Sequence, residues 1–277
     1  MNLFTSFKST SGINYLNGKT LCCRFACSSL LALTLASGIS FQAHAAEPVE
    51  YAEHIEGSAS SHSDAESIVT KAINSHSTYI TVSGDETAVK STKNAAFRTL
   101  ASPLHNYEEG TINEVSSHIT NDKCELVIGR LSTINEEKAV NCEVERLLPQ
   151  FNQGSTYDKI KAVHDYLCTT VAYSYSTVAS ADDYRSAYDA LINKTAVCTG
   201  YALSFQKFMD EMGIPCYIAY SNSHAWNIVN IDGTWYHIDC TNDDQEWGIS
   251  YHNFLVGAAD AGYSSWGNIT ISDTNYR

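Results

Sequence analysis

The stretch "AVCTGYALSFQKFMDEMGIPC", residues 196–216, places a cysteine, Cys198, at the start of a predicted helix. One side of that helix carries an apolar stripe at helical spacing, formed by Tyr201, Phe205, Phe208 and Met212. Gly213 and Pro215 end the helix. Because free N–H groups and the helix dipole stabilise negative charge at a helix start, we expect the thiol pKa of Cys198 to be lowered. A thiolate attacks amide carbonyls, so Cys198 is a candidate nucleophile.

Two strand-like segments follow, 224–231 and 234–241, and the dipeptide Asp232-Gly233 between them predicts a tight hairpin turn. With this turn His224 and Asp239 share one face of the ribbon as diagonal neighbours, with backbones about 7–8 Å apart. A carboxylate on one ring nitrogen fixes the imidazole and leaves the other nitrogen to take a thiol proton. A slip of one residue would move the two side chains to opposite faces.

Each of these three side chains also has a purely structural interpretation. A lone cysteine is more often a small buried hydrophobe, His224 fits a hydrogen-bonded residue at a strand end, and Asp239 fits a turn-capping acid. Taken together, however, they fill the roles of nucleophile, base and orienter. We therefore predict a catalytic triad of Cys198, His224 and Asp239.

The segments "AVCTGYALSFQKFMDEMGIPC", "HAWNIVNIDGTWYHIDCT" and "YHNFL" resemble the transglutaminase-like superfamily in type, order and spacing, over about residues 155–277. The resemblance implies an α+β fold, a papain-like transglutaminase core whose nucleophile helix packs on an antiparallel sheet. It also implies that Cys198 is the nucleophile, His224 the general base and acid, and Asp239 the orienter. The sequence "CTNDD" after Asp239 departs from the "TWDD" of many relatives and lacks their aromatic residue beside the site.

The N-terminus carries three cations, an apolar run "SSLLALTLASGISF" at 28–41 and then "AHAAEP". This pattern predicts a secretory signal peptide, residues 1–45, cleaved after Ala45. The apolar run is too short to favour the alternative, an uncleaved membrane anchor. We therefore expect a secreted or periplasmic protein with no stable membrane insertion after cleavage.

Beyond the leader we expect a linker at 46–65, a small α+β N-terminal domain at 66–152 and the transglutaminase-like domain at 153–277. The pattern of apolar and β-branched residues gives these further elements: helices at 63–76, 135–151, 156–173 and within 185–196, and strands at 77–84, 123–129, 216–221 and 251–257. No motif in the first half indicates chemistry.

Six of the nine cysteines lie beyond the leader, where an exported protein usually forms disulfides. Cys124 and Cys142 lie apart from the others in the sequence, and we expect a bridge between them. The whole chain carries a formal charge of −14 and becomes more acidic without the leader, which argues against nucleic acid as a partner.

The sequence predicts a cysteine-dependent acyl-transfer enzyme that cleaves peptide or amide bonds through a thioester. Hydrolysis is preferred, with protein or peptide substrates, cell-wall peptide among them. Protein cross-linking and a non-catalytic binding module of the same fold are the alternatives. No cofactor or calcium is implied. A metal site made of His224, His237, Cys240 and His252 fits no closed zinc pattern, and the acids after Asp239 fit a solvated loop better than a cation site.

Overall fold

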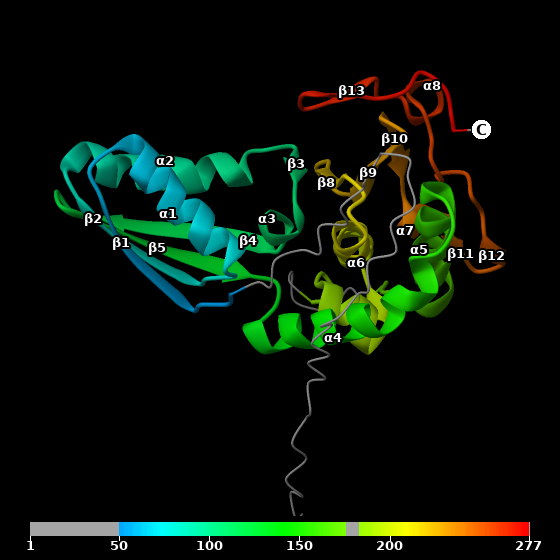
Figure 1. Ribbon diagram of the computed structural model, residues 1–277, viewed down its shortest axis with the longest axis horizontal. Coiled ribbons are helices and arrows are strands. Elements are labelled where there is room, and N and C mark those ends of the chain that lie inside the picture. The colour runs from blue at the N-terminus through cyan, green and yellow to red at the C-terminus, as the bar shows by residue number, and fades with distance from the viewer. Residues whose placement is uncertain (1–49, 176–182, 277) are drawn as a thin grey trace, which may run out of the picture. The chain divides into compact units, whose positions relative to one another are not determined.

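A computed structural model of the chain describes residues 50–175 and 183–276, which all belong to one compact unit, Phe41–Arg277 (Figure 1). The predicted leader, 1–45, lies outside the described residues. The fold is α+β, as predicted, and is organised around two sheets. None of the helices in the described ranges is long and apolar enough to cross a membrane.

The first sheet has the order β1 (His54–Ala59), β2 (Tyr79–Gly84), β5 (Lys123–Arg130) and β4 (Ile112–Ile119). Strands β1 and β2 run parallel, and the other neighbours are antiparallel. Helices α1 (His62–Asn74) and α2 (Glu86–Leu100) pack side by side on one face of it (Figure 1). Alternate strand residues point into this helix-covered core, among them Ile80, Val82, Cys124 and Leu126.

The two helices of this layer begin where the sequence offers an oxygen to their unpaired N–H groups. Ser61 accepts a hydrogen bond from the N–H of Asp64, and Asp85 accepts from Thr87 and Ala88. Sequence analysis missed α2 and assigned residues 54–59 to a loose linker. Those residues form β1 instead, because they pair with β2 through backbone hydrogen bonds. The polar sequence "HIEGSA" carries no apolar pattern that predicts this strand.

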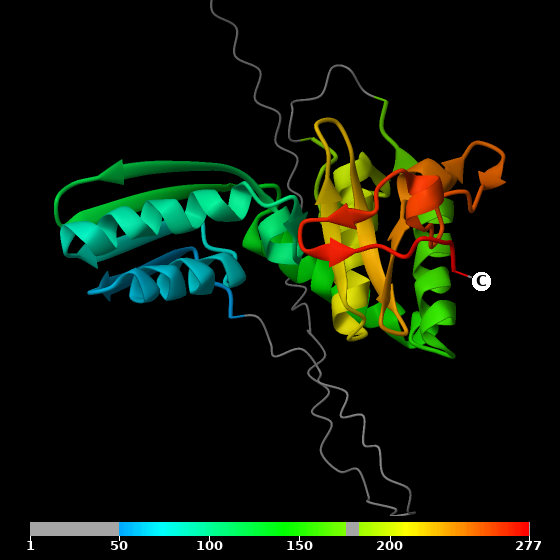
Figure 2. The same cartoon turned by 90° about the horizontal axis from the view of Figure 1, so that it is seen from above.

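The second sheet is antiparallel, in the order β10 (Thr234–Ile238), β9 (Ala225–Ile231), β8 (Cys216–Tyr220) and β3 (Leu104–His105). Helix α6 (Cys198–Glu211) packs on one face with α4 (Ile134–Phe151) and α5 (Thr156–Thr170) around it. On the opposite face lies the β13–β14 hairpin (Ser265–Trp266 and Ile269–Thr270), drawn red in Figure 2.

Helix α6 is buried far more completely than its predicted apolar stripe requires. Every residue from 199 to 209 is buried, including Gln206 and Lys207. The Lys207 ammonium lies 4.6 Å from the centre of the Tyr107 ring, which compensates part of its lost hydration. The helix that carries Cys198 is therefore held in place on all sides.

Strand β3 and helix α4 lie before the predicted domain boundary at 152, yet both join the second sheet and its core. Leu104 pairs with Ala219 and His105 with Ile218, while Phe151 packs against Phe208 with ring centroids 5.3 Å apart. The domain boundaries themselves stay a prediction.

The predicted hairpin register is confirmed. Thr234 pairs with Ile231 and Ile238 with Asn227, so the loop consists of Asp232 and Gly233. Both residues have positive φ, 52° and 85°, as a type I′ turn requires. Since side chains alternate along a strand, this turn decides which residues leave the sheet on the same face.

The remaining elements are short. They are α3 (Tyr107–Gly110), β6 (Ala172–Tyr173), a π-helical turn η1 (Asp189–Asn193), β7 (Thr195–Ala196), α7 (Cys240–Asp243), β11 (Asp244–Gln245), β12 (Gly248–Ile249) and α8 (Ala258–Ala261). The strand predicted at 251–257 is wrong: only Val256 makes a bridge, to His237. Tyr251 and Leu255 have φ of 56° and 53°, which is incompatible with an extended chain.

The predicted disulfide between Cys124 and Cys142 is also wrong. Cys124 carries a free, fully buried thiol inside the first sheet's core, whereas Cys142 lies exposed on α4. The two are consecutive cysteines in the sequence, but they lie in different environments and do not form a pair.

The core around α6 makes a prediction about stability. Replacing Phe208, which is fully buried, with alanine should lower the free energy of unfolding by about 3–5 kcal/mol, because the change removes apolar contacts and leaves a cavity. Phe97→Ala, at a side chain that is 40% exposed, is the matched control and should cost less than about 1 kcal/mol. Denaturant unfolding measures both, and equal losses would contradict this account of the core.

Candidate active site

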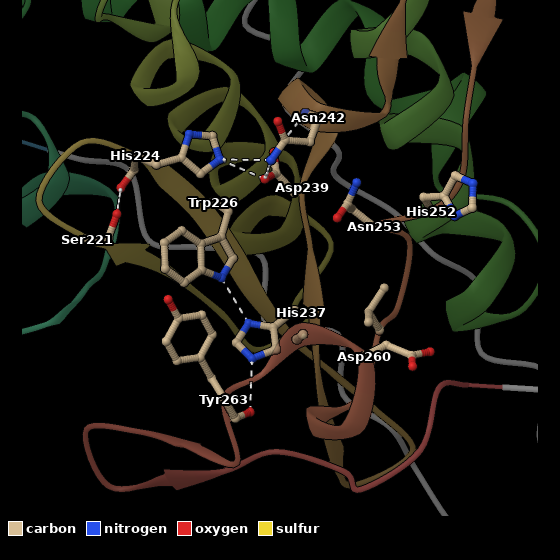
Figure 3. A pocket seen from close by; sticks show the side chains of 12 residues that line it. Ser221, His224, Trp226, His237, Asp239, Asn242, His252, Asn253, Asp260 and Tyr263 are labelled. Atoms are coloured by element: carbon tan, nitrogen blue, oxygen red, sulfur yellow. Dashed lines mark hydrogen bonds and ion pairs between the residues drawn. The ribbon is translucent and has the colours of Figure 1, made fainter.

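The three predicted catalytic side chains come from three elements of the second sheet and its helix. Cys198 is the first residue of α6, His224 directly precedes β9, and Asp239 directly follows β10. The structure brings them together, with the His224 ring and the Asp239 carboxylate facing each other (Figure 3). Their catalytic role stays a prediction.

The His224 Nε2 and the Asp239 Oδ2 lie 2.7 Å apart, a short charge-assisted hydrogen bond. This bond, followed by the hydrogen bond to Cys198, raises the pKa of His224 to about 10, although partial burial acts in the opposite direction. At neutral pH the ring is therefore an imidazolium held between a carboxylate and a sulfur.

The Cys198 thiol responds to the same arrangement. Burial raises its pKa, but the hydrogen bonds from His224 and from the backbone N–H of Ala225 together outweigh burial, and the net pKa is lowered. Since Nε2 of the ring bonds Asp239, Nδ1 is the nitrogen that remains for the sulfur. The chemistry available is that of a thiolate–imidazolium pair.

The start of α6 adds positive potential beneath this sulfur. The N-cap residue is Val197, whose side chain makes no capping hydrogen bond, so the first-turn N–H groups are not used by a side-chain cap. Such groups stabilise a thiolate and, during acyl transfer, the oxyanion that forms on the attacked carbonyl.

Asn242 is a site residue that sequence analysis missed. Asp239 is the N-cap of α7, its Oδ1 accepting from the Asn242 backbone N–H at 3.1 Å. The Asn242 side-chain amide donates to Asp239 Oδ2 at 2.7 Å and lies 3.5 Å from His224 Nε2. An Asn three residues after an Asp that ends a strand is the signal that could have revealed the cap.

A cavity of about 330 Å³ opens beside the imidazole, lined by His224, Asp239 and Asn242 among others (Figure 3). The Trp226 indole stacks against the His224 ring at 5.9 Å and 15°, and its Nε1–H donates to His237 Nδ1 at 2.9 Å. Cys198 does not line this cavity. Trp226 therefore covers one face of the His224 ring, and the cavity lies beside this imidazole and not beside the Cys198 sulfur.

The alternative metal set, His224, His237, Cys240 and His252, is not assembled. His224 bonds Asp239, His237 accepts from Trp226, and the Cys240 sulfur groups with His164 and Cys168. Of the acids after Asp239, Glu246 is exposed, but Asp243 and Asp244 are not solvated loop residues. Asp243 is fully buried, and the Asp244 carboxylate accepts from the Tyr201 hydroxyl at 2.6 Å.

The lowered pKa of Cys198 predicts its reactivity with iodoacetamide. An ordinary thiol of pKa about 8.5 loses thiolate about tenfold for each pH unit below that value. The alkylation rate of Cys198 should fall less than that of the exposed Cys142 between about pH 8 and pH 6. Mass spectrometry of the peptides measures both rates in one sample. His224→Ala should abolish the difference, and parallel pH profiles in the unchanged chain would contradict the ion pair.

The family model of the transglutaminase-like superfamily matches residues 146–240. No curated protein sequence matches the chain significantly. Among solved structures, a TGase is 17% identical with a TM-score of 0.37, covering 62% of this chain and 53% of its own.

Two further solved structures are similar to the chain. A candidate cysteine protease from Cytophaga hutchinsonii is 16% identical, with a TM-score of 0.29 and coverage of 46% and 61%. The periplasmic domain of TgpA from Pseudomonas aeruginosa is 16% identical, with a TM-score of 0.29 and coverage of 43% and 55%. The chain thus spans between half and two thirds of these three structures. The stretch that the model of the transglutaminase-like superfamily matches, residues 146–240, spans Cys198, His224 and Asp239.

Proposed function

We propose that this protein is an exported cysteine-dependent enzyme of acyl transfer that hydrolyses peptide or amide bonds through a thioester. The observation that carries the proposal is the contact of three side chains: the Cys198 sulfur at the start of α6, the His224 ring and the Asp239 carboxylate. Members of the transglutaminase-like superfamily are typically cysteine-dependent enzymes, which supports the same reaction class.

In the first half of the proposed reaction, the Cys198 thiolate attacks the carbonyl carbon and forms a tetrahedral oxyanion, which the first-turn N–H groups of α6 stabilise. The C–N bond then breaks. The leaving nitrogen takes the proton from His224 Nδ1 and departs as a neutral amine, and the acyl group stays on sulfur as a thioester. Asp239 holds the ring and stabilises its charged form before that transfer.

In the second half, water or an amine attacks the thioester. The now neutral His224 takes a proton from the attacking group, the C–S bond breaks, and the thiolate–imidazolium pair is restored. Water gives a carboxylic acid, whereas a primary amine gives a cross-linked amide. We favour water, because the cavity of about 330 Å³ beside the imidazole is lined largely by polar side chains and gives solvent a path to the base.

The leader pattern in residues 1–45 supports export, and we propose peptide or protein substrates outside the cytoplasm, with cell-wall peptide as one candidate. A binding module that has lost its chemistry is the second candidate function. The intact set of Cys198, His224 and Asp239 argues against it, since a module that only binds has no use for a thiolate held by an imidazolium.

Incubation of the protein with a peptide library and a labelled primary amine tests the reaction class. We expect shortened or deamidated peptides, read by mass spectrometry, and an excess of hydrolysis over amine incorporation. Cys198→Ala should abolish both products with an unchanged circular dichroism spectrum, while Cys142→Ala, at an exposed cysteine on α4, should retain them. Turnover by Cys198→Ala would reject the assignment of the nucleophile.

The Asp239–His224 bond predicts the alkaline limit of the activity. Because the leaving amine needs the His224 proton, the rate should fall as the pH rises through the raised pKa of about 10. Asp239→Asn removes the largest cause of that raised pKa, so this limit should move to lower pH and kcat/KM should drop at least about 100-fold.

Asp260→Asn is the matched control for this prediction. Asp260 lines the same cavity, but its carboxylate accepts from Asn275 and makes no bond to the imidazole. Its alkaline limit should stay where it is in the unchanged protein. An Asp239→Asn profile with the same alkaline limit as the control would show that Asp239 does not govern the protonation of His224.

A further inference from the structure

A second group of sulfur and nitrogen donors lies behind Asp239, on helices α5 and α7. It consists of His164, Cys168, Cys240 and Asp243, each less than a tenth exposed. On α5 the histidine and cysteine are four residues apart, and on α7 the cysteine and aspartate are three apart, so each pair shares one side of its helix. One donor atom each of His164, Cys168 and Cys240 lie within 4.8 Å of one another.

Two of the distances at the His164 nitrogen match those between ligands of one tetrahedral ion, whereas Asp243 lies outside the group of three donors that are all within 4.8 Å of one another. The Cys168 Sγ lies 3.7 Å from the His164 Nε2, and the Asp243 Oδ2 lies 3.2 Å from the same nitrogen. A zinc ion with bonds of about 2.3 Å to sulfur and about 2.0–2.1 Å to nitrogen or oxygen separates S from N by about 3.6 Å and N from O by about 3.3 Å. A small rotation of the Asp243 side chain would bring its Oδ2 toward the two sulfurs.

The surrounding hydrogen bonds orient this His and Asp as in known zinc sites. His164 Nδ1 bonds Asp165 Oδ1 at 3.1 Å, which fixes the ring and directs Nε2 into the cluster. Asp243 Oδ1 accepts from the Ser250 hydroxyl and from the backbone and side-chain N–H groups of Asn253. Its other oxygen, Oδ2, faces His164 and is the one placed to bind a metal.

We propose that His164 Nε2, Cys168 Sγ, Cys240 Sγ and Asp243 Oδ2 form a structural zinc site that ties α5 to α7. On binding, the two thiol protons and any proton on Nε2 leave to solvent, and a dication compensates the buried thiolates and carboxylate. The site is closed, with four protein ligands and no position for substrate. This inference rests on its own residues and not on the proposed reaction.

The position of α7 indicates what the proposed zinc would stabilise. This helix begins at the residue after Asp239, and its Asn242 donates two hydrogen bonds to the Asp239 carboxylate, in addition to the one from His224. Cys240 and Asp243 flank Asn242 on a helix of four residues, which is too short to be stable alone. A metal that binds both residues would fix α7, and through it the orientation of Asp239.

A disulfide between Cys168 and Cys240 is the competing use of these sulfurs, and simple packing is another, since the Cys168 thiol donates to the Cys240 carbonyl oxygen at 3.3 Å. Neither explains why the His164 nitrogen, oriented by its Asp165 hydrogen bond, lies within 4.8 Å of both sulfurs. That convergence favours the metal.

The test is the metal content of the full chain, purified from its own compartment without added metal or chelator. Inductively coupled plasma mass spectrometry should find about one zinc per chain. Cys168→Ser and Cys240→Ser should each lower this at least tenfold. Cys216→Ser, at a buried cysteine of β8 outside the cluster, is the matched control and should retain the metal.

A second measurement covers variants that fail to fold. The unchanged chain, stripped with a chelator, should melt at a lower temperature and regain its Tm with zinc. Loaded with Co²⁺, it should show the near-ultraviolet charge-transfer band of a cobalt–thiolate bond, which Cys216→Ser should also show.

Two results would overturn the proposal. The first is a metal-free chain whose intact mass is lower by two hydrogen atoms, with Cys168 and Cys240 joined by a disulfide. The second is a metal-free chain that binds no added Co²⁺ and in which both thiols become alkylated after unfolding, which would mean simple packing. Either result leaves the proposed reaction intact, because Cys198 takes no part in this cluster.

Discussion

The 2.7 Å hydrogen bond between His224 and Asp239 is the constraint on which the candidate site depends. The two residues lie at the open end of a hairpin, at the far end of both strands from the turn. The two-residue loop of Asp232 and Gly233 sets the strand register, and this register puts His224 and Asp239 on one face. The His224–Asp239 bond also affects Cys198. The Asp239 carboxylate raises the pKa of His224, and the charged ring lowers the pKa of the Cys198 thiol.

Besides His224, Asp239 also contacts helix α7, which connects the candidate site to buried residues behind it. It caps α7, and α7 packs against α5 through residues buried behind the imidazole. One carboxylate thus connects a solvent-facing ring to a dry cluster of sulfur, nitrogen and oxygen donors. The same short helix therefore carries the Asn242 cap of Asp239 and two members of that cluster.

The sequence predicts the parts of this structure that follow from local rules. The turn dipeptide specifies the register, the register specifies the His224–Asp239 pair, and apolar spacing together with Gly213 and Pro215 specifies α6 and its end. What it could not predict depends on distant partners. Strand β1 forms because β2 pairs with it. Tyr251 and Leu255 adopt left-handed backbone conformations, which their residue types do not favour.

The same limit applies to the site. In the sequence Asn242 only marks a departure from the "TWDD" pattern, and its role depends on the cap geometry of Asp239, which the structure shows. His164 lies 79 residues from Asp243, whose carboxylate it contacts, and Cys168 lies 72 residues from Cys240, whose backbone carbonyl it contacts. Spacing along the chain cannot bring such residues together, so the six cysteines beyond the leader could be counted from the sequence but not assigned.

The pairing of β3 with β8 limits how freely this fold can be rearranged. A fragment starting at residue 153 would retain the whole triad, yet it would lose α4 and leave the β8 backbone with an open edge. Open edges recruit other strands, so such a fragment would tend to aggregate. A graft of the C-terminal half that keeps the β8 edge covered therefore has to include Leu104–His105.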